Sequence, residues 1–193
     1  KYLSFARANK LGVGTLFQDQ FKESRMMYQY GALHVNSGDT GLAEIEDATF
    51  AICRCLTHLI IPNGVTKIGD GAFEGCSSLK ELTIPNTVTK MGNGVFNGCT
   101  SIVNVNMPNE ITEIGDRVFK DCSSLSEINI PKDVIMIGKE TFRGCSSLSM
   151  ITIPSRVKTI GRDIFFRCTN LKNVYCMAAI LPQHHKDTFV FFE

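Results

Sequence analysis

The sequence predicts a solenoid of stacked coils, an α/β repeat fold with a parallel sheet of short strands on its concave face and short helical turns on its convex face. Three observations predict it: a proline recurs with a 23-residue period, several other positions keep the same step, and each repeat contains a short segment of alternating apolar and polar residues. A fixed period of about 20 to 50 residues is typical of proteins built from stacked units.

The proline follows an apolar residue at five places, each one 23-residue step from the next: Ile61-Pro62, Ile84-Pro85, Met107-Pro108, Ile130-Pro131 and Ile153-Pro154. Four more columns keep this step: Phe50, Phe73, Phe96, Phe119, Phe142 and Phe165; Cys53, Cys76, Cys99, Cys122, Cys145 and Cys168; Gly69, Gly92, Gly115, Gly138 and Gly161; Leu56, Leu79, Ile102, Leu125, Leu148 and Leu171. No insertion breaks the register over these repeats. Ordinary loop composition does not produce such a strict period.

Each unit is expected to begin with a strand, as residues 79–84 illustrate. Leu82 faces the core while Glu81 and Thr83 point outward, because side chains alternate along a strand. Pro85 ends the strand, since it has no N–H to donate to a ladder. Stacking such strands about 4.8 Å apart buries each apolar column against its own copies.

The second part of each unit is expected to turn and form one helical turn. Gly92 allows a backbone turn that a Cβ would hinder. Asn93, Asp70 and Asp116 stand where a helix N-cap would satisfy the first free N–H groups. The helical turn then carries the Phe and Cys columns.

Residues 1–38 do not keep the period, and we expect them to form an N-terminal cap that covers the first coil. Residues 15–28 have aromatic residues at helical spacing, and residues 32–35 are compatible with a strand. A degraded repeat is the alternative, because Leu33 lies one 23-residue step before Leu56. Residues 39–193 are expected to form the repeat domain, with about six 23-residue repeats and an irregular closing repeat.

The pattern L-x-x-L-x-I-P-x-x-V-x-x-M-G-x-x-V-F-x-x-C of residues 79–99 resembles the BspA-like, or Treponema-type, leucine-rich repeat. The resemblance covers about residues 39–193 and is most specific over 62–171. Residues 174–182 resemble the closing repeat of the gut-Bacteroidetes branch of this family. Met177 replaces the expected Pro there, and Phe189 arrives one residue late for its column, so we expect a distorted last coil.

Composition excludes several classes of function. A formal net charge of +1 argues against a protein whose main partner is nucleic acid. No run approaches the roughly 18 to 20 apolar residues that a transmembrane helix needs. The chain starts at Lys1 without a Met or an apolar signal-peptide core, so we expect either a mature fragment or a segment chosen for expression, and no signal peptide is visible.

The cysteines are expected to be reduced and buried, because their column occupies an apolar position at the end of the turn. Stacked strands would place column cysteines about 5 Å apart at Cα, a distance that a disulfide also tolerates, so bridging stays open. Cys55 and Cys176 stand off the column.

No residue pattern predicts catalysis, a cofactor or a metal. Cys53, Cys55 and His58 lack the second ligand pair of a zinc site, and the adjacent His184 and His185 point apart in an extended segment. No nucleophile motif, phosphate loop or HExxH is present. We therefore expect a protein that is not an enzyme.

The exposed side of the sheet is the candidate binding surface. Two outward columns cross it: His58, Glu81, Asn104, Glu127, Met150 and Asn173, and Ile60, Thr83, Asn106, Asn129, Thr152 and Tyr175. The middle offers hydrogen bonds to a neutral polar partner, and the ends are better suited to apolar contact. Solvated sheet is the alternative for each single residue.

A second surface feature is a basic excess near the C-terminus. It comprises Lys132, Lys139, Arg143, Arg156, Lys158, Arg162, Arg167 and Lys172, against Asp133, Glu140 and Asp163. An acidic glycan or a lipid surface would suit it. A solvated face is the alternative.

The polar sheet predicts a binding module that recognises a protein or glycan through its concave face, and the family resemblance implies that the module lies on a cell surface, in a periplasm or is secreted. The family resemblance implies adhesion, including binding to host extracellular matrix proteins. A structural spacer within a larger surface protein is the alternative. The sequence makes no prediction of the oligomeric state.

Overall fold

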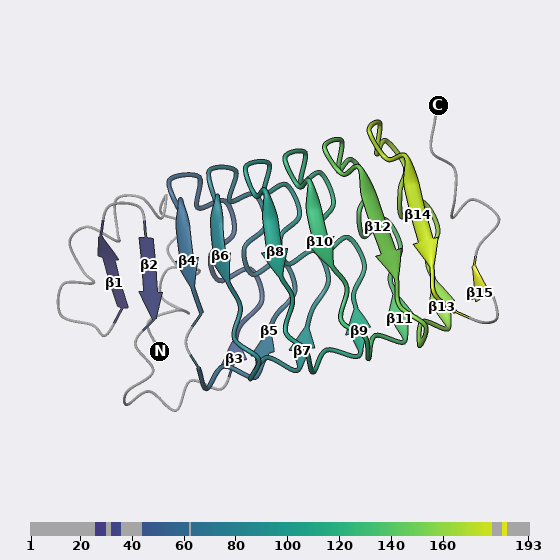
Figure 1. The fold of residues 1–193 in the computed structure, drawn as a ribbon. Coiled ribbons are helices and arrows are strands. Elements are labelled where there is room, and N and C mark those ends of the chain that lie inside the picture. The colour runs from purple at the N-terminus through teal and green to yellow at the C-terminus, as the bar shows by residue number, and fades with distance from the viewer. Residues whose placement is uncertain (1–25, 30–31, 36–43, 62, 179–182, 185–193) are drawn as a thin grey trace.

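A computed structural model describes residues 26–29, 32–35, 44–61, 63–178 and 183–184, with side chains for 44–61 and 63–178. The coils stack along one axis from the N-terminal to the C-terminal side, each contributing one strand to a main sheet (Figure 1). The solenoid and its 23-residue step are as the sequence predicts, because paired strands join residues one such step apart, as His58 with Glu81.

The main sheet runs across the whole stack. Its first part is β1 (Met26–Gln29), β2 (Ala32–Val35), β4 (His58–Ile60), β6 (Glu81–Thr83), β8 (Asn104–Asn106) and β10 (Glu127–Asn129), hydrogen-bonded in that order. The pair β12 (Met150–Ile153) and β14 (Asn173–Cys176) continues it (Figure 1). Apart from the antiparallel β1–β2 pair, the strands are parallel.

A second row of very short strands lies along one edge of the stack and was not predicted. Its members are β3 (Glu44–Ile45), β5 (Lys67–Ile68) and β7 (Lys90–Met91), then β9 (Glu113–Ile114), β11 (Met136–Ile137), β13 (Thr159–Ile160) and β15 (Gln183–His184). In the coils from β3 to β13, the second residue of each is buried. From β5 to β13, a residue of the glycine column directly follows each of these strands.

The expected helical turns are wrong: the described residues contain strands and turns but no helix. In the turn segment, alternate N–H groups donate to the next coil, as Phe73 N does to Val95 O at 3.0 Å. The intervening groups bond within the coil, as Cys76 N does to Phe73 O at 3.2 Å. A helix would direct all of them inside one segment.

Two residues per turn segment adopt the left-handed conformation, four positions apart. In the third coil they are Gly94 and Gly98, with φ of 60° and 73°. Other coils place Arg117, Asp121, Glu140 or Ile52 at the same columns, also with positive φ. Left-handed residues at this spacing interrupt any run of helical dihedrals, which explains the absence of a helix.

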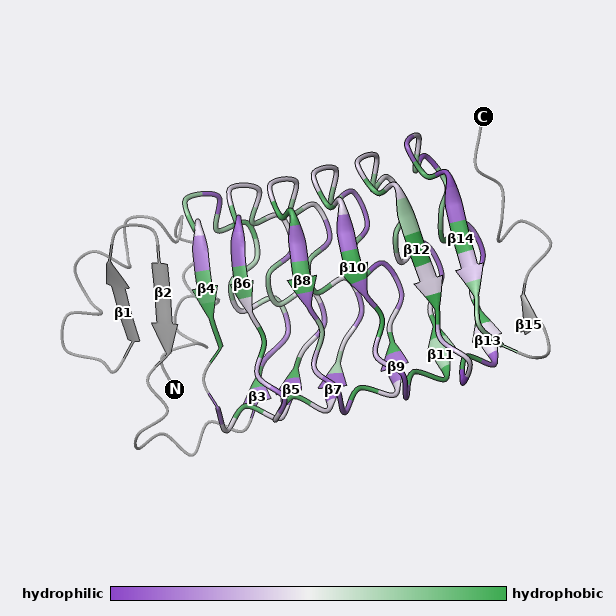
Figure 2. Ribbon diagram, in the orientation of Figure 1, coloured by the Kyte–Doolittle hydropathy of each residue, from purple (hydrophilic) through white to green (hydrophobic). Residues whose placement is uncertain are grey.

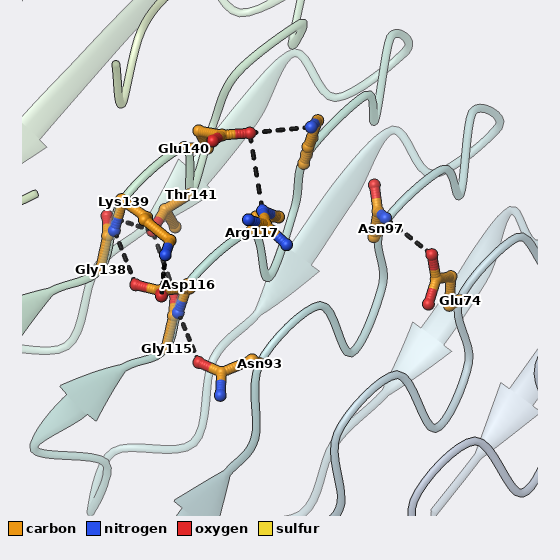
Figure 3. Close-up of polar contacts among 11 residues, drawn as sticks. Glu74, Asn93, Asn97, Gly115, Asp116, Arg117, Gly138, Lys139, Glu140 and Thr141 are labelled. Carbon is orange, nitrogen blue, oxygen red and sulfur yellow. Dashed lines mark hydrogen bonds and ion pairs between the residues drawn. The ribbon is translucent and has the colours of Figure 1, made fainter. Parts of the chain in front are cut away.

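The N-cap prediction is also wrong, since these side chains accept from the next coil. Asp70 Oδ1 accepts the Asn93 N–H at 2.7 Å, and Asn93 Oδ1 accepts the Asp116 N–H at 2.9 Å. Asp116 Oδ1 in turn accepts the Lys139 N–H at 2.9 Å (Figure 3). The column is therefore a hydrogen-bonded seam between coils.

The Gly69–Gly161 column serves close approach of neighbouring coils and not an unusual dihedral. A Cβ placed on Gly92 would lie 2.7 Å from the Asp70 backbone N, and one on Gly115 would lie 2.9 Å from the Gly92 O. Real Cβ atoms do not come this close to backbone atoms. The column sets the spacing of the coils at the seam.

The core is a stack of identical side chains. Neighbouring rings of the Phe column lie 5.3 to 6.1 Å apart between centroids and within 13° of parallel, the arrangement of offset-stacked aromatic pairs. Beside them the column thiols donate to a Phe carbonyl in the preceding coil, as Cys99 Sγ does to Phe73 O at 3.2 Å. All eight cysteines are free, and only Cys55 and Cys176 are exposed.

Both ends of the array depart from the period. The strand Ala32–Val35 is present as expected. A helix was expected over residues 15–28, but Met26–Gln29 is a strand. Residues 15–25 lie outside the described residues. Leu33 pairs with Leu59 and not with Leu56, so the 23-residue step of a degraded repeat is not kept. At the other end Thr159 pairs with Gln183, one position beyond that step, so the register slips by the one residue expected from Phe189, which itself lies outside the described residues.

Candidate functional site

The candidate binding surface is the outward side of the main sheet, which we call the ladder face. It consists of His58, Glu81, Asn104, Glu127, Met150 and Asn173 in one ladder and Ile60, Thr83, Asn106, Asn129, Thr152 and Tyr175 in the other. The residues between them, Leu59, Leu82, Val105, Ile128, Ile151 and Val174, face the core. Strand alternation places the two ladders on one side, so all twelve predicted residues share a surface.

The register brings ladder residues of neighbouring coils directly beside one another. Asn104 is the partner of Glu127, and Asn106 is the partner of both Thr83 and Asn129. Parallel strands lie about 4.8 Å apart, so these side chains form a continuous row of donors and acceptors. Apart from the half-buried His58, every ladder residue is exposed.

The first strands carry a histidine–carboxylate contact at the edge of this row. His58 Nε2 lies 3.3 Å from Glu81 Oε1, and His58 Nδ1 lies 2.8 Å from the Thr57 hydroxyl. These contacts hold the imidazole across two coils. The N-terminal part of the ladder face is therefore polar and partly preorganised, except for the exposed Ile60.

The C-terminal part is more apolar. Met150 and Tyr175 are 51% and 50% exposed, and Met177, one position beyond the last strand, is 63% exposed. Figure 2 shows hydrophilic residues on β4, β6, β8 and β10, a paler β12, and a β14 that is hydrophilic where it begins and paler where it ends. Met177 was not among the predicted site residues. The sequence does mark it as unusual, because it stands in the proline column, where each of the five preceding repeats has Pro.

No cluster of metal ligands forms in the described part of the chain: within residues 44–61 and 63–178 no three His, Cys, Asp or Glu side chains are grouped to hold an ion. Cys53 belongs to the buried column, whereas Cys55 is exposed. Burial raises the pKa of Cys122 and Cys145, and raises that of Cys168 to about 12, so these thiols stay protonated. The side chains of His184 and His185 lie outside the described residues.

The basic excess contains a half-buried carboxylate that the sequence did not single out. Glu140 Oε2 lies 2.8 Å from Lys120 Nζ and 3.6 Å from Arg117 Nε, and its side chain is only 12% exposed (Figure 3). The hydrogen bond from Lys120 chiefly lowers the pKa of this carboxyl, against the opposing effect of burial, with further help from the charges of Arg117 and Arg143. The cluster joins two coils on the turn side of the solenoid.

Comparison with known proteins identifies the repeat. The profile of the BspA-type leucine-rich repeat region matches residues 43–172, in six copies. The chain belongs to the BspA-type leucine-rich repeat family. A comparison with curated proteins gave no match.

Two solved structures of leucine-rich repeat proteins resemble this BspA-type chain. The T. pallidum leucine-rich repeat protein TpLRR is 28% identical, with a TM-score of 0.75 over 79% of this chain and 72% of that one. A leucine-rich cell surface protein of Faecalibacterium prausnitzii A2-165 is 30% identical, with a TM-score of 0.68 over 75% of this chain. The match spans 39% of the length of the F. prausnitzii protein.

Among the residues that the structure describes, no helix has the length and hydropathy of a transmembrane span.

Proposed function

We propose that the chain is a non-enzymatic binding module, displayed on a bacterial cell surface or secreted, which holds a protein or glycan partner on its ladder face. The main support is a contrast between the buried core columns and the exposed ladder residues. The Phe and Cys columns are identical in all six coils, whereas the ladder residues change from coil to coil on the same rigid backbone. A surface of this kind is suited to specific recognition over several strands.

The chemistry of the ladder face favours a partner that is polar in the middle and apolar toward one end. Asn104, Asn106 and Asn129 each offer an amide donor and a carbonyl acceptor, which match the hydroxyl and amide groups of a glycan or peptide. Tyr175 and Met150 offer apolar contact. The surface location is supported by the F. prausnitzii relative, which is a cell surface protein.

The decisive experiment screens the chain against an array of host matrix proteins and glycans, then compares two variants on whatever is retained. The test variant is N104A/N106A/E127A/Y175A. The matched control, K90A/E113A/T159A, removes exposed residues from the second row of strands. We expect the test variant to lose about 30-fold or more in affinity, the effect of one hot-spot residue, while the control keeps wild-type affinity.

Both variants should unfold at nearly the wild-type temperature, because all of their substituted residues are exposed. If the test variant and the wild type bound the partner with equal affinity, the ladder face would be ruled out as the binding site.

A structural spacer is the second candidate. The observation in its favour is that the F. prausnitzii relative is much longer than the matched segment, so in that protein the repeats are one part of a larger chain. A spacer would retain nothing on the array, and substitutions on the ladder face would change neither binding nor stability.

A further inference from the structure

Charge is separated along the solenoid axis, although the whole chain is nearly neutral. Residues 44–131 contain 11 acidic and 6 basic residues, a net charge of −5. Residues 132–178 contain 3 acidic and 8 basic residues, a net charge of +5. The first four coils and the last two therefore carry opposite charge.

The same surface columns reverse their sign along the stack. One column of the turn segment reads Asp47, Asp70, Asn93, Asp116, Lys139 and Arg162, and another reads Ala51, Glu74, Asn97, Lys120, Arg143 and Phe166. We call the surface that these two columns form the turn face. Asp47, Asp70, Glu74 and Arg162 are exposed on it, and Lys139 and Arg143 are half-buried.

This order of charges is complementary to itself when reversed. A two-fold axis between the third and fourth coils, lying in the turn face and across the solenoid axis, sets coil one of one copy against coil six of the other. Each column then meets its own reverse: Asp47 faces Arg162, Asp70 faces Lys139, and Glu74 faces Arg143. We propose that the turn face binds a second copy of this chain in this antiparallel, isologous arrangement.

An exposed apolar residue on the first coil supports the same arrangement. Ile52 is 61% exposed and adopts φ of 63°, a conformation that a β-branched side chain rarely accepts. The two-fold places it opposite the sixth coil, where the half-buried Phe166 ring lies 4.4 Å from the Arg143 guanidinium carbon and 5.5 Å from that of Arg167. Contact with this cluster would remove the exposed isoleucine from water.

A second copy fits the turn face better than a polyanion does. A polyanion that bound the basic residues of the turn face and extended toward the N-terminus would meet Asp70 and Glu74 in the same two columns. Only a partner whose charges run in the opposite order contacts both halves favourably, and the chain itself has that order. Because exposed ion pairs are individually weak, the association should be weak and sensitive to salt.

The test follows the association state of the 193-residue chain by sedimentation velocity over a range of concentration and salt. We expect a reversible dimer at low salt that dissociates in about 1 M NaCl, where the Debye length is about 3 Å. An acidic variant, R143E, and a basic variant, E74K, should each be monomeric alone and form a heterodimer when mixed, because residue 143 of one copy faces residue 74 of the other. These substitutions leave the Asp47–Asp116 seam intact.

The matched control is E81K, which changes the net charge as much as E74K does but lies on the ladder face. It should dimerise like the wild type, and all variants should keep the wild-type unfolding temperature in high salt. A wild-type chain that is monomeric at every concentration would overturn the proposal, as would mixed variants that fail to associate. Retention on heparin without self-association would assign the basic coils to a polyanion instead.

Discussion

The interior and the ladder face belong to the same coils but follow opposite rules. Inside, one side chain must pack against its own copy in the neighbouring coil, as the parallel Phe rings do, so the residue type repeats. Outside, Asn104 and Glu127 are also partners in register, yet they differ in size and charge. The contrast shows that repetition accompanies packing in this fold, whereas the exposed ladder residues vary from coil to coil.

The largest effect that tests this contrast is expected from the Phe column. Phe96→Ala should lower the free energy of unfolding by about 3 to 5 kcal/mol, because it opens a cavity between two stacked rings. Asn104→Ala, in the same coil but on the ladder face, should change it by about 0.5 kcal/mol or less. Urea titration of the two variants measures both, and equal losses would contradict the contrast.

The next effect concerns the glycine column at the seam. Gly92→Ala should cost about 3 kcal/mol, since its Cβ would lie 2.7 Å from the Asp70 backbone N and the coils would have to separate. Gly94→Ala, whose Cβ would have 3.8 Å to the nearest atom, meets only left-handed strain and should cost about 1 to 2 kcal/mol. Thermal unfolding of both variants checks the order, and the reverse order would show that backbone dihedrals set the glycine column.

A smaller effect, with the opposite sign, is expected at a variable surface position. Ile52→Gly should raise the free energy of unfolding by about 0.5 to 1 kcal/mol, because relief of left-handed strain exceeds the added freedom of glycine in the unfolded chain. Ile52→Val keeps the β-branch and should bring no gain. Denaturation in high salt, where self-association is suppressed, makes the comparison, and a loss in the glycine variant would show that packing of Ile52 outweighs its strain.

The smallest effect should appear only in the dependence of stability on pH. The folded state lowers the pKa of Glu140, so the ionised carboxylate stabilises the fold above the unfolded pKa of about 4.3. That stabilisation is lost as the pH falls from there through the lower folded pKa. Relative to wild type, Glu140→Gln should therefore be less stable at neutral pH and approach wild type in acid.

The control for this titration is Glu113→Gln, which removes an exposed carboxylate in the preceding coil. Its unfolding curve should stay close to wild type throughout. Parallel curves for wild type and Glu140→Gln over the whole range would contradict the role given to the Lys120 and Arg117 contacts.

The fold was largely predictable because its information is written in columns. The Phe, Cys, Gly and Leu positions predicted the step and the buried side of each coil, and alternation in residues 79–84 predicted which side chains form the ladder face. The one-residue slip at the closing repeat was also visible in the late Phe189, and the pairing of Gln183 agrees with it. The binding role of the ladder residues remains a prediction.

The turn segment was not predictable by the same route. Asn93 looks like an N-cap when only its own segment is considered, because Asx residues before an apolar turn usually serve that purpose. Its actual donor is the backbone N–H of Asp116, in the next coil. The second row of strands and the Glu140 cluster were missed for the same reason: their partners also lie in neighbouring coils.

The sequence by itself determined the period, the buried columns and the order of charges along the axis, because each of these depends only on which residue stands at which step. The tertiary structure alone decided where the backbone N–H groups of the turn bond, why its glycines are needed, and that Lys120 and Arg117 meet on Glu140. The physical reason is that a coil of this solenoid is completed by its neighbours. Rules that relate residues within one short segment do not identify a partner in the next coil.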